Sequence, residues 1–289
     1  MKANFASFTQ GAQEVSTTSG RLPVVPGVRE ITTNDIDVGE QIGQGGFSVI
    51  HKGTLNGTPV AIKKIFDPNM TNELLSEIQN EIVMQSILRH PNIALLMGCC
   101  PTIPNIVIVY ELVDNSLFTM LHMKRTVDIP LPMRVKIALD CARVYLYMHN
   151  LGIVHRDIKS HNVLVDNNFN VKVCDFGLAR FFVSISQAIW PRKIINLISS
   201  LVAHSSSSSS NLTQADLGTG TLQYAGTPCY MAPELFQKRQ YNEKVDVFAF
   251  GTLLWETLER KVPFDGFETP EIRAKVESGE QLRANYGLD

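Results

Sequence analysis

The chain has 289 residues, 44% of them hydrophobic and 19% charged, which is enough to bury the core of one large domain or of two lobes. A net charge of −2 gives no reason to expect a nucleic-acid partner or an anionic membrane surface. The five cysteines show no paired metal spacing, residues 1–15 lack the pattern of a signal peptide, and no apolar run is long enough to span a bilayer. We therefore expect a cytoplasmic protein with reduced thiols and no membrane anchor.

The first part of the chain predicts a flexible leader followed by a small sheet. Residues 1–35 are rich in Ser, Thr, Gly and Gln, and we expect them to form the leader. Apolar and polar residues then alternate as in antiparallel strands in three stretches, 36–42, 48–52 and 58–65. A run of apolar residues at 106–110 predicts a further, buried strand.

Residues 71–89 follow a helical period instead. One face of this helix carries five residues at three- and four-residue steps: Leu74, Ile78, Glu81, Gln85 and Leu88. Burying Glu81 is costly unless a cation meets its carboxylate. Lys63, on the predicted strand at 58–65, is the cation that we expect there, and a solvated surface lysine is the alternative.

The second part of the chain predicts a larger helical unit. Residues 131–150 form a helical run that ends near Gly152, and residues 242–259 are apolar on nearly all sides, as in a helix buried inside a lobe. Between them, the stretch from about 183 to 216 contains six consecutive serines and predicts an inserted flexible linker. The predicted elements indicate an α+β fold with a small β-rich lobe and a larger helical lobe.

A glycine-rich loop, residues 43–48, lies between the first two predicted strands. Without a Cβ, Gly43 and Gly45 let backbone amides approach phosphate oxygens closely. The same residues also suit an ordinary hairpin turn. Lys63, paired with Glu81, would present its ammonium group to the α- and β-phosphates of a nucleotide.

The strongest motif is His-Arg-Asp-Ile-Lys-Ser-His-Asn at residues 155–162. Asp157 can accept the proton of an incoming hydroxyl, and Lys159 can neutralise a γ-phosphate. Asn162 and Asp175, the latter in an Asp-Phe-Gly motif, supply the oxygen ligands that Mg²⁺ prefers. Each motif alone could be a chance polar loop, but their order, with Ala-Pro-Glu downstream at 232–234, indicates phosphoryl transfer.

With these motifs the chain resembles the eukaryotic protein kinase family from about residue 36 to 280. Within that family, residues 97–100, 155–162 and 226–234 resemble the tyrosine-kinase-like group of the Raf or mixed-lineage-kinase type. The resemblance implies a two-lobed kinase fold, ATP and Mg²⁺ as cofactors, and a protein substrate in intracellular signalling.

The same resemblance assigns the lobes and the specificity. The small lobe with its hinge would span residues 36–113, and the larger lobe 114–289. Lys159 and Thr227 match the pattern of serine/threonine kinases, which disfavours a tyrosine kinase.

Site residues also follow from the resemblance. The implied catalytic residues are Lys63, Glu81, Asp157 and Lys159, and the implied metal ligands are Asn162 and Asp175. Tyr110 would be the gatekeeper behind the adenine pocket, with hinge backbone contacts from the two residues 111 and 113. The implied nucleotide-binding set is Ile42, Gly43, Gly45, Ile50, Ala61, Lys63, Tyr110, Glu111, Val113 and Leu164, of which Ile50, Ala61 and Leu164 would sandwich the adenine ring.

Regulatory residues are implied as well. A spine containing Leu96, His155 and Phe176 would be anchored by Asp246. Arg156 would receive a phosphate added to the activation loop by an upstream kinase, and the candidate acceptors are Thr219, Thr221 and the nearby serine tract. The alternative is that these two threonines are merely solvated loop hydroxyls.

Three departures from the family pattern stand out. Gln85 occupies a usually apolar spine position, which would make the active arrangement less stable. The stretch at about 183–216 lengthens the activation segment and is either an insertion or a translated intron. The chain ends shortly after Pro263-Phe264, so we expect a truncated large lobe with exposed apolar surface and Glu234 without its usual arginine. A kinase-like scaffold, or a weakly active truncated product that binds nucleotide or partners, is therefore the alternative function.

Overall fold

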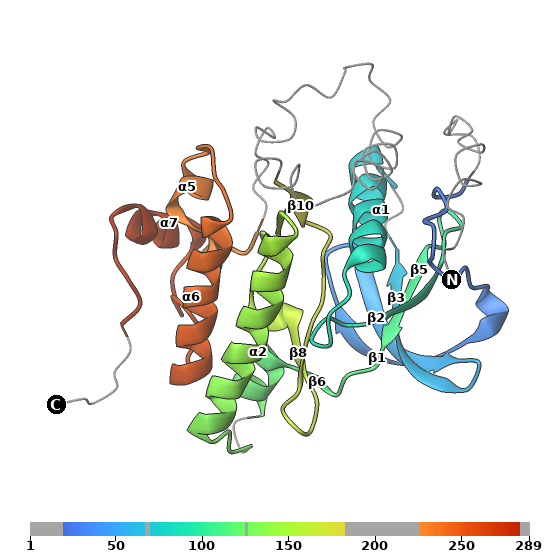
Figure 1. Ribbon diagram of the computed structural model, residues 1–289, viewed down its shortest axis with the longest axis horizontal. Helices are drawn as coiled ribbons and strands as arrows, with labels where there is room; N and C mark the ends of the chain where they lie inside the picture. Colours follow the sequence, from blue (N-terminus) through green and yellow to red (C-terminus); the bar gives the residue numbers. More distant parts are fainter. Residues whose placement is uncertain (1–19, 67–69, 125–126, 183–225, 284–289) are drawn as a thin grey trace.

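The computed structural model describes residues 20–66, 70–124, 127–182 and 226–283. They form a smaller lobe built on a β-sheet and a larger, mainly helical lobe (Figure 1). The α+β, two-lobed fold that the sequence predicts is therefore confirmed.

The sheet of the smaller lobe has five antiparallel strands in the order β1-β2-β3-β5-β4. Asn56 and Gly57, which join β2 to β3, both have positive φ, as a two-residue hairpin turn requires, and glycine meets that need without strain. Four strands agree with the predicted stretches: β1 Ile36–Gln44, β2 Ser48–Leu55, β3 Thr58–Ile65 and β5 Val107–Glu111. Strand β4, Leu96–Cys100, was not predicted.

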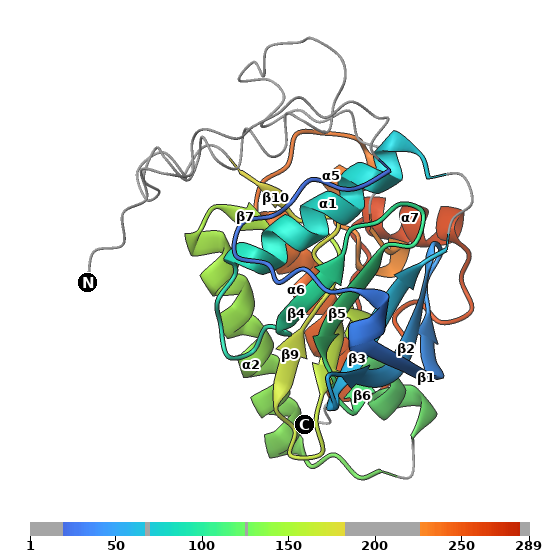
Figure 2. The same cartoon turned by 90° about the vertical axis from the view of Figure 1, so that its right-hand side faces the viewer.

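Helix α1 (Asn72–Ile87) lies against one face of this sheet (Figure 2). Thr71 caps the helix, because its hydroxyl accepts a hydrogen bond of 3.3 Å from the backbone amide of Leu74. Ile78 and Ile82 pack with Ile108 of β5 in one apolar cluster. The predicted inward face of this helix is buried, so α1 brings Glu81 to the sheet.

Residues 20–35 are packed against the smaller lobe, so the prediction of a flexible leader is wrong for them. Leu22 and Val25 are 5% exposed and join the cluster under α1. Backbone hydrogen bonds tie this segment to the edge strand β4, from Ile31 to the carbonyl of Cys99 and from Cys99 to the carbonyl of Arg29. The composition of residues 1–35 taken as a whole concealed the apolar residues of this segment, which helps to cover an open sheet edge. Residues 1–19 lie outside the described residues.

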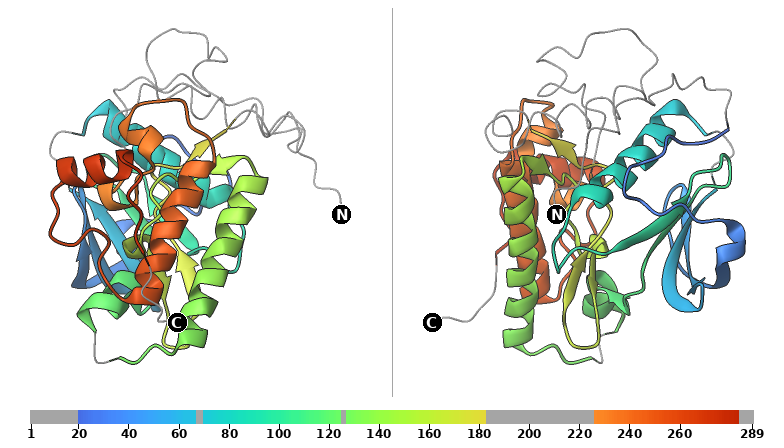
Figure 3. Two further views of the ribbon diagram at one scale, coloured as in Figure 1. Left: turned by 90° about the vertical axis from the view of Figure 1, so that its left-hand side faces the viewer. Right: turned by 45° about the vertical axis from the view of Figure 1, so that its right-hand side comes forward.

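The larger lobe is built around two helices, α2 (Leu131–Asn150) and α6 (Lys244–Glu259), which lie side by side (Figure 3). Among the described residues, the other α-helices of this lobe are α5 Pro233–Phe236 and α7 Thr269–Glu277. Short strands form a β6-β8-β9 sheet and a β7-β10 pair: β6 Asn115–Ser116, β7 Ile153–Val154, β8 Val163–Val165, β9 Val171–Val173 and β10 Arg180–Phe181. The loops between these strands hold the polar motifs.

Helix α6 is not buried on all sides, so that part of the prediction is wrong. Val247 and Phe248 are 51% and 36% exposed. Helix α2 also exposes apolar side chains on one face: Leu131, Val135, Leu139 and Leu146. A helix with apolar residues on all sides is buried only where other elements pack against each side. The composition of the helix does not show whether such elements are present.

Two further predictions on the chain's organisation concern the insertion and the membrane anchor. The proposed insertion at about 183–216 lies outside the described residues, as do Thr219 and Thr221. Within the described ranges, we find no helix that combines the length and the hydropathy needed to cross a bilayer.

Candidate active site

Four of the predicted nucleotide-site residues share one face of the sheet. Side chains alternate between the faces of a strand, so Ala61 and Lys63 of β3 point to the same side. Ile50 of β2 pairs directly with Lys63, and Tyr110 of β5 pairs directly with Ala61. Ile108, which also pairs with Lys63, belongs to the cluster under α1, so this face is the one that α1 covers.

On that face Lys63 forms the predicted ion pair with Glu81. The ammonium nitrogen lies 2.8 Å from each carboxylate oxygen, and Glu81 is only 5% exposed. Burial by itself would lower the pKa of Lys63, but the carboxylates of Glu81 and Asp175 outweigh it and raise the pKa. Lys63 is thus a fixed cation that α1 holds against β3.

Tyr110 contributes a contact to this pair that the sequence did not predict. Its hydroxyl donates a hydrogen bond of 2.6 Å to Oε1 of Glu81. Burial, and then the neighbouring carboxylate of Glu81, raise the pKa of Tyr110 far above its usual value, so the hydroxyl stays a donor. The predicted gatekeeper therefore also holds Glu81.

The other predicted nucleotide residues border the same region. Glu111 and Val113, the expected hinge residues, are half-buried, and the Glu111 carboxylate is held by Lys172 at 2.9 Å. Leu164 of β8 is half-buried in the larger lobe, while Ile42 of β1 is 47% exposed. In the glycine-rich loop, the Gly45 amide donates to the Ser48 carbonyl at 2.7 Å, and Gly43 packs against the Ile50 side chain.

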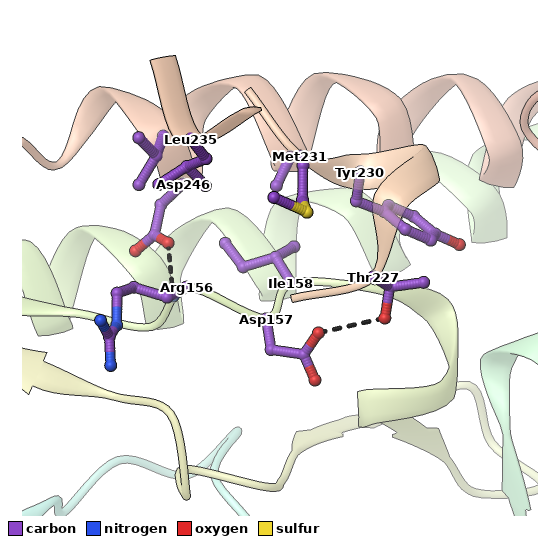
Figure 4. Close-up of a pocket in the computed structure, with 10 residues that line it drawn as sticks. Arg156, Asp157, Ile158, Thr227, Tyr230, Met231, Leu235 and Asp246 are labelled. Carbon is purple, nitrogen blue, oxygen red and sulfur yellow. Dashed lines mark hydrogen bonds between the residues drawn. The ribbon is translucent and has the colours of Figure 1, made fainter. Parts of the chain in front are cut away.

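The loop at residues 155–162, called the catalytic loop below, gathers a second polar cluster around Asp157. Figure 4 draws Asp157 and Thr227 of this cluster. Oδ2 of Asp157 accepts a hydrogen bond of 2.9 Å from Nδ2 of Asn162 and lies 2.6 Å from the Lys159 ammonium. Thr227 donates to Oδ1 of Asp157 at 3.2 Å and accepts from Lys159 at 3.0 Å. Asp157 is thus oriented from three sides, and it is only 8% exposed.

Asp175 connects the two clusters electrostatically. Burial alone would raise its pKa, but the positive charges of Lys63 and Lys159 outweigh that effect and lower it below the usual value. Asp175 is therefore an ionised carboxylate between the cation of the smaller lobe and the cation of the catalytic loop.

The residues fit a Mg²⁺ ion. Asn162 donates from its Nδ2 to Asp157, which leaves the Oδ1 oxygen of its amide as the possible ligand. Its backbone carbonyl accepts a hydrogen bond of 3.0 Å from the amide of Cys174, the residue before Asp175. An amide oxygen and an ionised carboxylate on adjoining segments are the hard oxygen donors that this ion prefers.

Comparison with known proteins agrees with this geometry. The model of the family described as "Protein kinase domain" matches residues 36–284 of the chain. The chain belongs to the protein kinase domain family. It is 34% identical over 249 residues to a probable serine/threonine-protein kinase of Dictyostelium discoideum, a match that covers 86% of this chain and 24% of the relative.

Two further relatives match a similar part of the kinase domain. The "Probable serine/threonine-protein kinase SIS8" of Arabidopsis thaliana is 37% identical over 250 residues, 86% of this chain and 21% of the relative. The "Dual specificity protein kinase shkC" of Dictyostelium discoideum is 37% identical over 241 residues, 82% of this chain and 42% of the relative. The match therefore spans less than half the length of each of these three relatives.

Asp246 of α6 anchors the catalytic loop of this kinase domain through its backbone. Its carboxylate accepts hydrogen bonds from the backbone amides of His155, at 2.8 Å, and Arg156, at 2.9 Å. The rings of His155 and Phe176 lie 5.2 Å apart and are fully buried. Leu96, the third expected spine residue, lies beside a different apolar cluster, the one that packs under α1.

Arg156 and Arg180 lie close together beside this anchor. The Arg156 guanidinium donates to the Leu178 carbonyl at 2.7 Å and to the Tyr241 hydroxyl at 3.0 Å. Burial, followed by the charge of Arg156, lowers the pKa of Arg180 to about 10. Arg180 remains a cation at neutral pH, and together with the guanidinium of Arg156 it makes this a site of concentrated positive charge.

A small pocket lies beneath the catalytic loop of the kinase domain. Asp157 is the only predicted catalytic residue in its lining, and none of the predicted nucleotide-binding residues takes part. Apolar side chains from the segment after Thr227 and from α6 form most of its wall. The full lining is Arg156, Asp157, Ile158, Thr227, Tyr230, Met231, Leu235, Val245, Asp246 and Ala249.

Sequence reasoning missed a buried network around Glu256 of α6. Its fully buried carboxylate accepts hydrogen bonds from Ser160 at 2.7 Å and from Tyr230 at 2.6 Å, and lies 2.9 Å from Nε2 of His122. This network links the catalytic loop to the segment after Thr227. The rule that found Glu81, a carboxylate among apolar helix residues, applies equally to Glu256 and could have found it.

Proposed function

We propose that this protein kinase domain transfers the γ-phosphate of ATP to serine or threonine hydroxyls of a protein. The observation that supports it most is the cluster around Asp157, whose carboxylate lies 2.6 Å from the Lys159 ammonium and 2.9 Å from the Asn162 amide. The charges of Lys63 and Lys159 both lower the pKa of Asp175, which relates this cluster to the Lys63–Glu81 pair. A phosphoryl-transfer site needs this combination of fixed cations, metal-binding oxygens and a base.

In this proposal Asp157 accepts the proton of the acceptor hydroxyl as its oxygen attacks the γ-phosphorus. The new bond joins that oxygen to phosphorus, the bond from phosphorus to the β,γ-bridging oxygen breaks, and ADP leaves. Lys159 neutralises charge on the transferred group, and Lys63 binds the α- and β-phosphates. Mg²⁺ held by Asn162 and Asp175 would neutralise further phosphate charge.

The preference for serine and threonine is supported by the contacts of Lys159. Its ammonium bridges Asp157 and Thr227, as expected from the serine/threonine pattern. The names of two relatives point to the same specificity, while shkC is named as a dual-specificity kinase. We also propose the finer placement in the tyrosine-kinase-like group, a division of the lobes at residues 113 and 114, and a role in cytoplasmic signalling.

Control by an upstream kinase is part of the proposal. Arg156 and Arg180 offer two neighbouring guanidinium groups that could receive a phosphorylated side chain. Thr219 and Thr221 are the proposed acceptors, although both lie outside the described residues. Replacing both with alanine should abolish activation by an upstream kinase, and unchanged activation would reject this part.

The direct test is phosphate transfer from Mg²⁺-ATP to a generic acceptor protein, with the Asp157→Asn variant beside the wild type. Incorporation should be lost in the variant, and phosphoamino-acid analysis should find phosphoserine and phosphothreonine. Equal incorporation in both proteins would reject catalysis. Nucleotide binding without transfer by the wild type would favour the alternative, a kinase-like scaffold, for which the buried Gln85 is the motivating feature.

A further inference from the structure

Through Asn80, helix α1 holds the start of the activation segment, which is the stretch from Asp175 to Glu234. Asn80 precedes Glu81 and is 9% exposed. Its side-chain nitrogen Nδ2 lies within hydrogen-bond distance of three backbone carbonyls that follow Asp175: Phe176 at 3.2 Å, Gly177 at 3.1 Å and Ala179 at 3.0 Å. One amide therefore gathers the backbone immediately after the proposed metal ligand.

The backbone at this point needs such a partner. Asp175 has a φ of 63°, in the left-handed region that a residue other than glycine rarely occupies, so surrounding contacts must hold it. The next residues form a turn, closed by a 3.0 Å hydrogen bond from the amide of Ala179 to the carbonyl of Phe176. Arg180 donates to two of the same carbonyls, at 2.8 and 2.9 Å.

Asn80 and Glu81 are consecutive, so α1 makes two connections with one short stretch of helix. Glu81 fixes Lys63 on the sheet, while Asn80 fixes the turn that follows Asp175. Gly177 lies beside both, since a Cβ atom there would sit 3.9 Å from Oε2 of Glu81. A movement of α1 would therefore displace the proposed metal ligand together with the ion pair.

We propose that Asn80 is a positioning residue that makes the placement of Asp175 depend on the position of α1. The proposal rests on the proposed function, in which Asp175 binds the metal. Asparagine suits the task because its neutral NH₂ group offers two donors, whereas an aspartate would turn oxygens toward the carbonyls. An apolar residue would remove the donor that these three carbonyls share and leave them only their hydrogen bonds to the Ala179 amide and to Arg180.

The test compares Asn80→Leu with Gln79→Met. Both variants replace a buried amide of α1 with an apolar side chain of similar length, but Gln79 donates to the Pro23 carbonyl at 3.4 Å and forms no hydrogen bond with the described part of the activation segment. We expect Asn80→Leu to lower kcat about tenfold, as for the loss of one or two buried hydrogen bonds, and to raise the Mg²⁺ concentration needed for half-maximal rate. KM for the acceptor protein should not change, and Gln79→Met should behave as the wild type.

Hydrogen exchange gives a second measurement that does not depend on activity. Amides of residues 176–181 should exchange faster in Asn80→Leu than in the wild type or in Gln79→Met. This result would support the proposal even if the wild type transferred no phosphate, an outcome that would reject only the proposed function. Equal exchange in the two variants, with equal Mg²⁺ dependence, would overturn the proposal. If Asn80→Leu does not fold, Asn80→Ala replaces it. Faster exchange of residues 176–181 and a higher Mg²⁺ requirement are then expected, and the absence of both changes would overturn the proposal.

Discussion

The carboxylates of Asp157 and Glu81 stand on opposite sides of the same site, and they are held in different ways. Asp157 is oriented by Lys159 and Asn162, which lie two and five residues away in the chain, and by Thr227. Glu81 is held by Lys63 of β3 and Tyr110 of β5, so its position requires three separate elements to meet.

This difference shows where the site is easiest to disturb. The cluster at Asp157 is built largely by one loop, which Asp246 ties down through two backbone amides. The cluster at Glu81 depends on how α1 packs, and α1 carries an unfavourable residue in Gln85, which is 1% exposed. We therefore expect the smaller lobe to limit the stability of the active arrangement.

The largest effect should follow from a substitution in the cluster at Asp157. Asp157→Asn keeps the size of the side chain but removes the proposed base, so the transfer rate should fall about 10³-fold. The melting temperature should barely change, since Asn162 and Thr227 remain. Rates with a generic acceptor protein measure the effect, with Asp166→Asn in the loop after β8 as the control. A residual rate within tenfold of the wild type would contradict the assignment of Asp157.

Lys63→Met should have the next largest effect. The loss of the cation should lower kcat/KM for ATP about 10²-fold, as for other groups that stabilise transition-state charge. It also leaves the buried Glu81 with only Tyr110, so the melting temperature should fall as well, unlike that of Asp157→Asn. Lys64→Met is the matched control, because Lys64 is the exposed neighbour on the opposite face of β3. An unchanged melting temperature for Lys63→Met would contradict the expectation that the cluster at Glu81 is easier to destabilise than the cluster at Asp157.

The same contrast explains how much the sequence could predict. The residues of the catalytic loop lie within eight positions of one another, so the motif alone brought Asp157, Lys159 and Asn162 together. The Lys63–Glu81 pair was predicted because a carboxylate on the inward face of a helix needs a cation. Strands β1 to β3 and helix α1 followed from periods of two and 3.6 residues, β5 followed from a run of apolar residues, and β4 was not predicted.

What could not be predicted depends on tertiary contacts between distant residues. The hydrogen bond from Tyr110 to Glu81 joins residues 29 positions apart, and nothing in the local pattern around Tyr110 marks it as a donor. Asn80 lies outside the predicted inward face, yet it is buried because the activation segment covers that side of α1 as well. The packing of Leu22 on α1 was hidden because the leader was predicted from the composition of residues 1–35 as a whole.

A smaller effect should come from Tyr110→Phe, which tests whether the third contact to Glu81 matters. Loss of one hydrogen bond to a buried carboxylate should lower kcat/KM for ATP about fivefold, since the ion pair with Lys63 remains. Tyr147→Phe, which removes a hydroxyl bonded to the backbone of Arg89, is the control and should leave the rate unchanged. Equal rates for Tyr110→Phe and the wild type would show that Lys63 alone suffices to hold Glu81.

The smallest effect, and the only favourable one, should come from Gln85→Leu. Nε2 of Gln85 is buried and has no hydrogen-bond partner among the residues that the structure describes. Burying an unsatisfied amide costs about 1–3 kcal/mol, so an apolar side chain of similar size should raise the melting temperature by a few degrees.

Thermal unfolding of Gln85→Leu beside Gln79→Leu would measure this gain. The control gives up a hydrogen bond to Pro23, so it should gain less. A lower melting temperature for Gln85→Leu than for the wild type would mean that Gln85 has a favourable role. In that case Gln85 would no longer support the expectation that the smaller lobe limits the stability of the active arrangement.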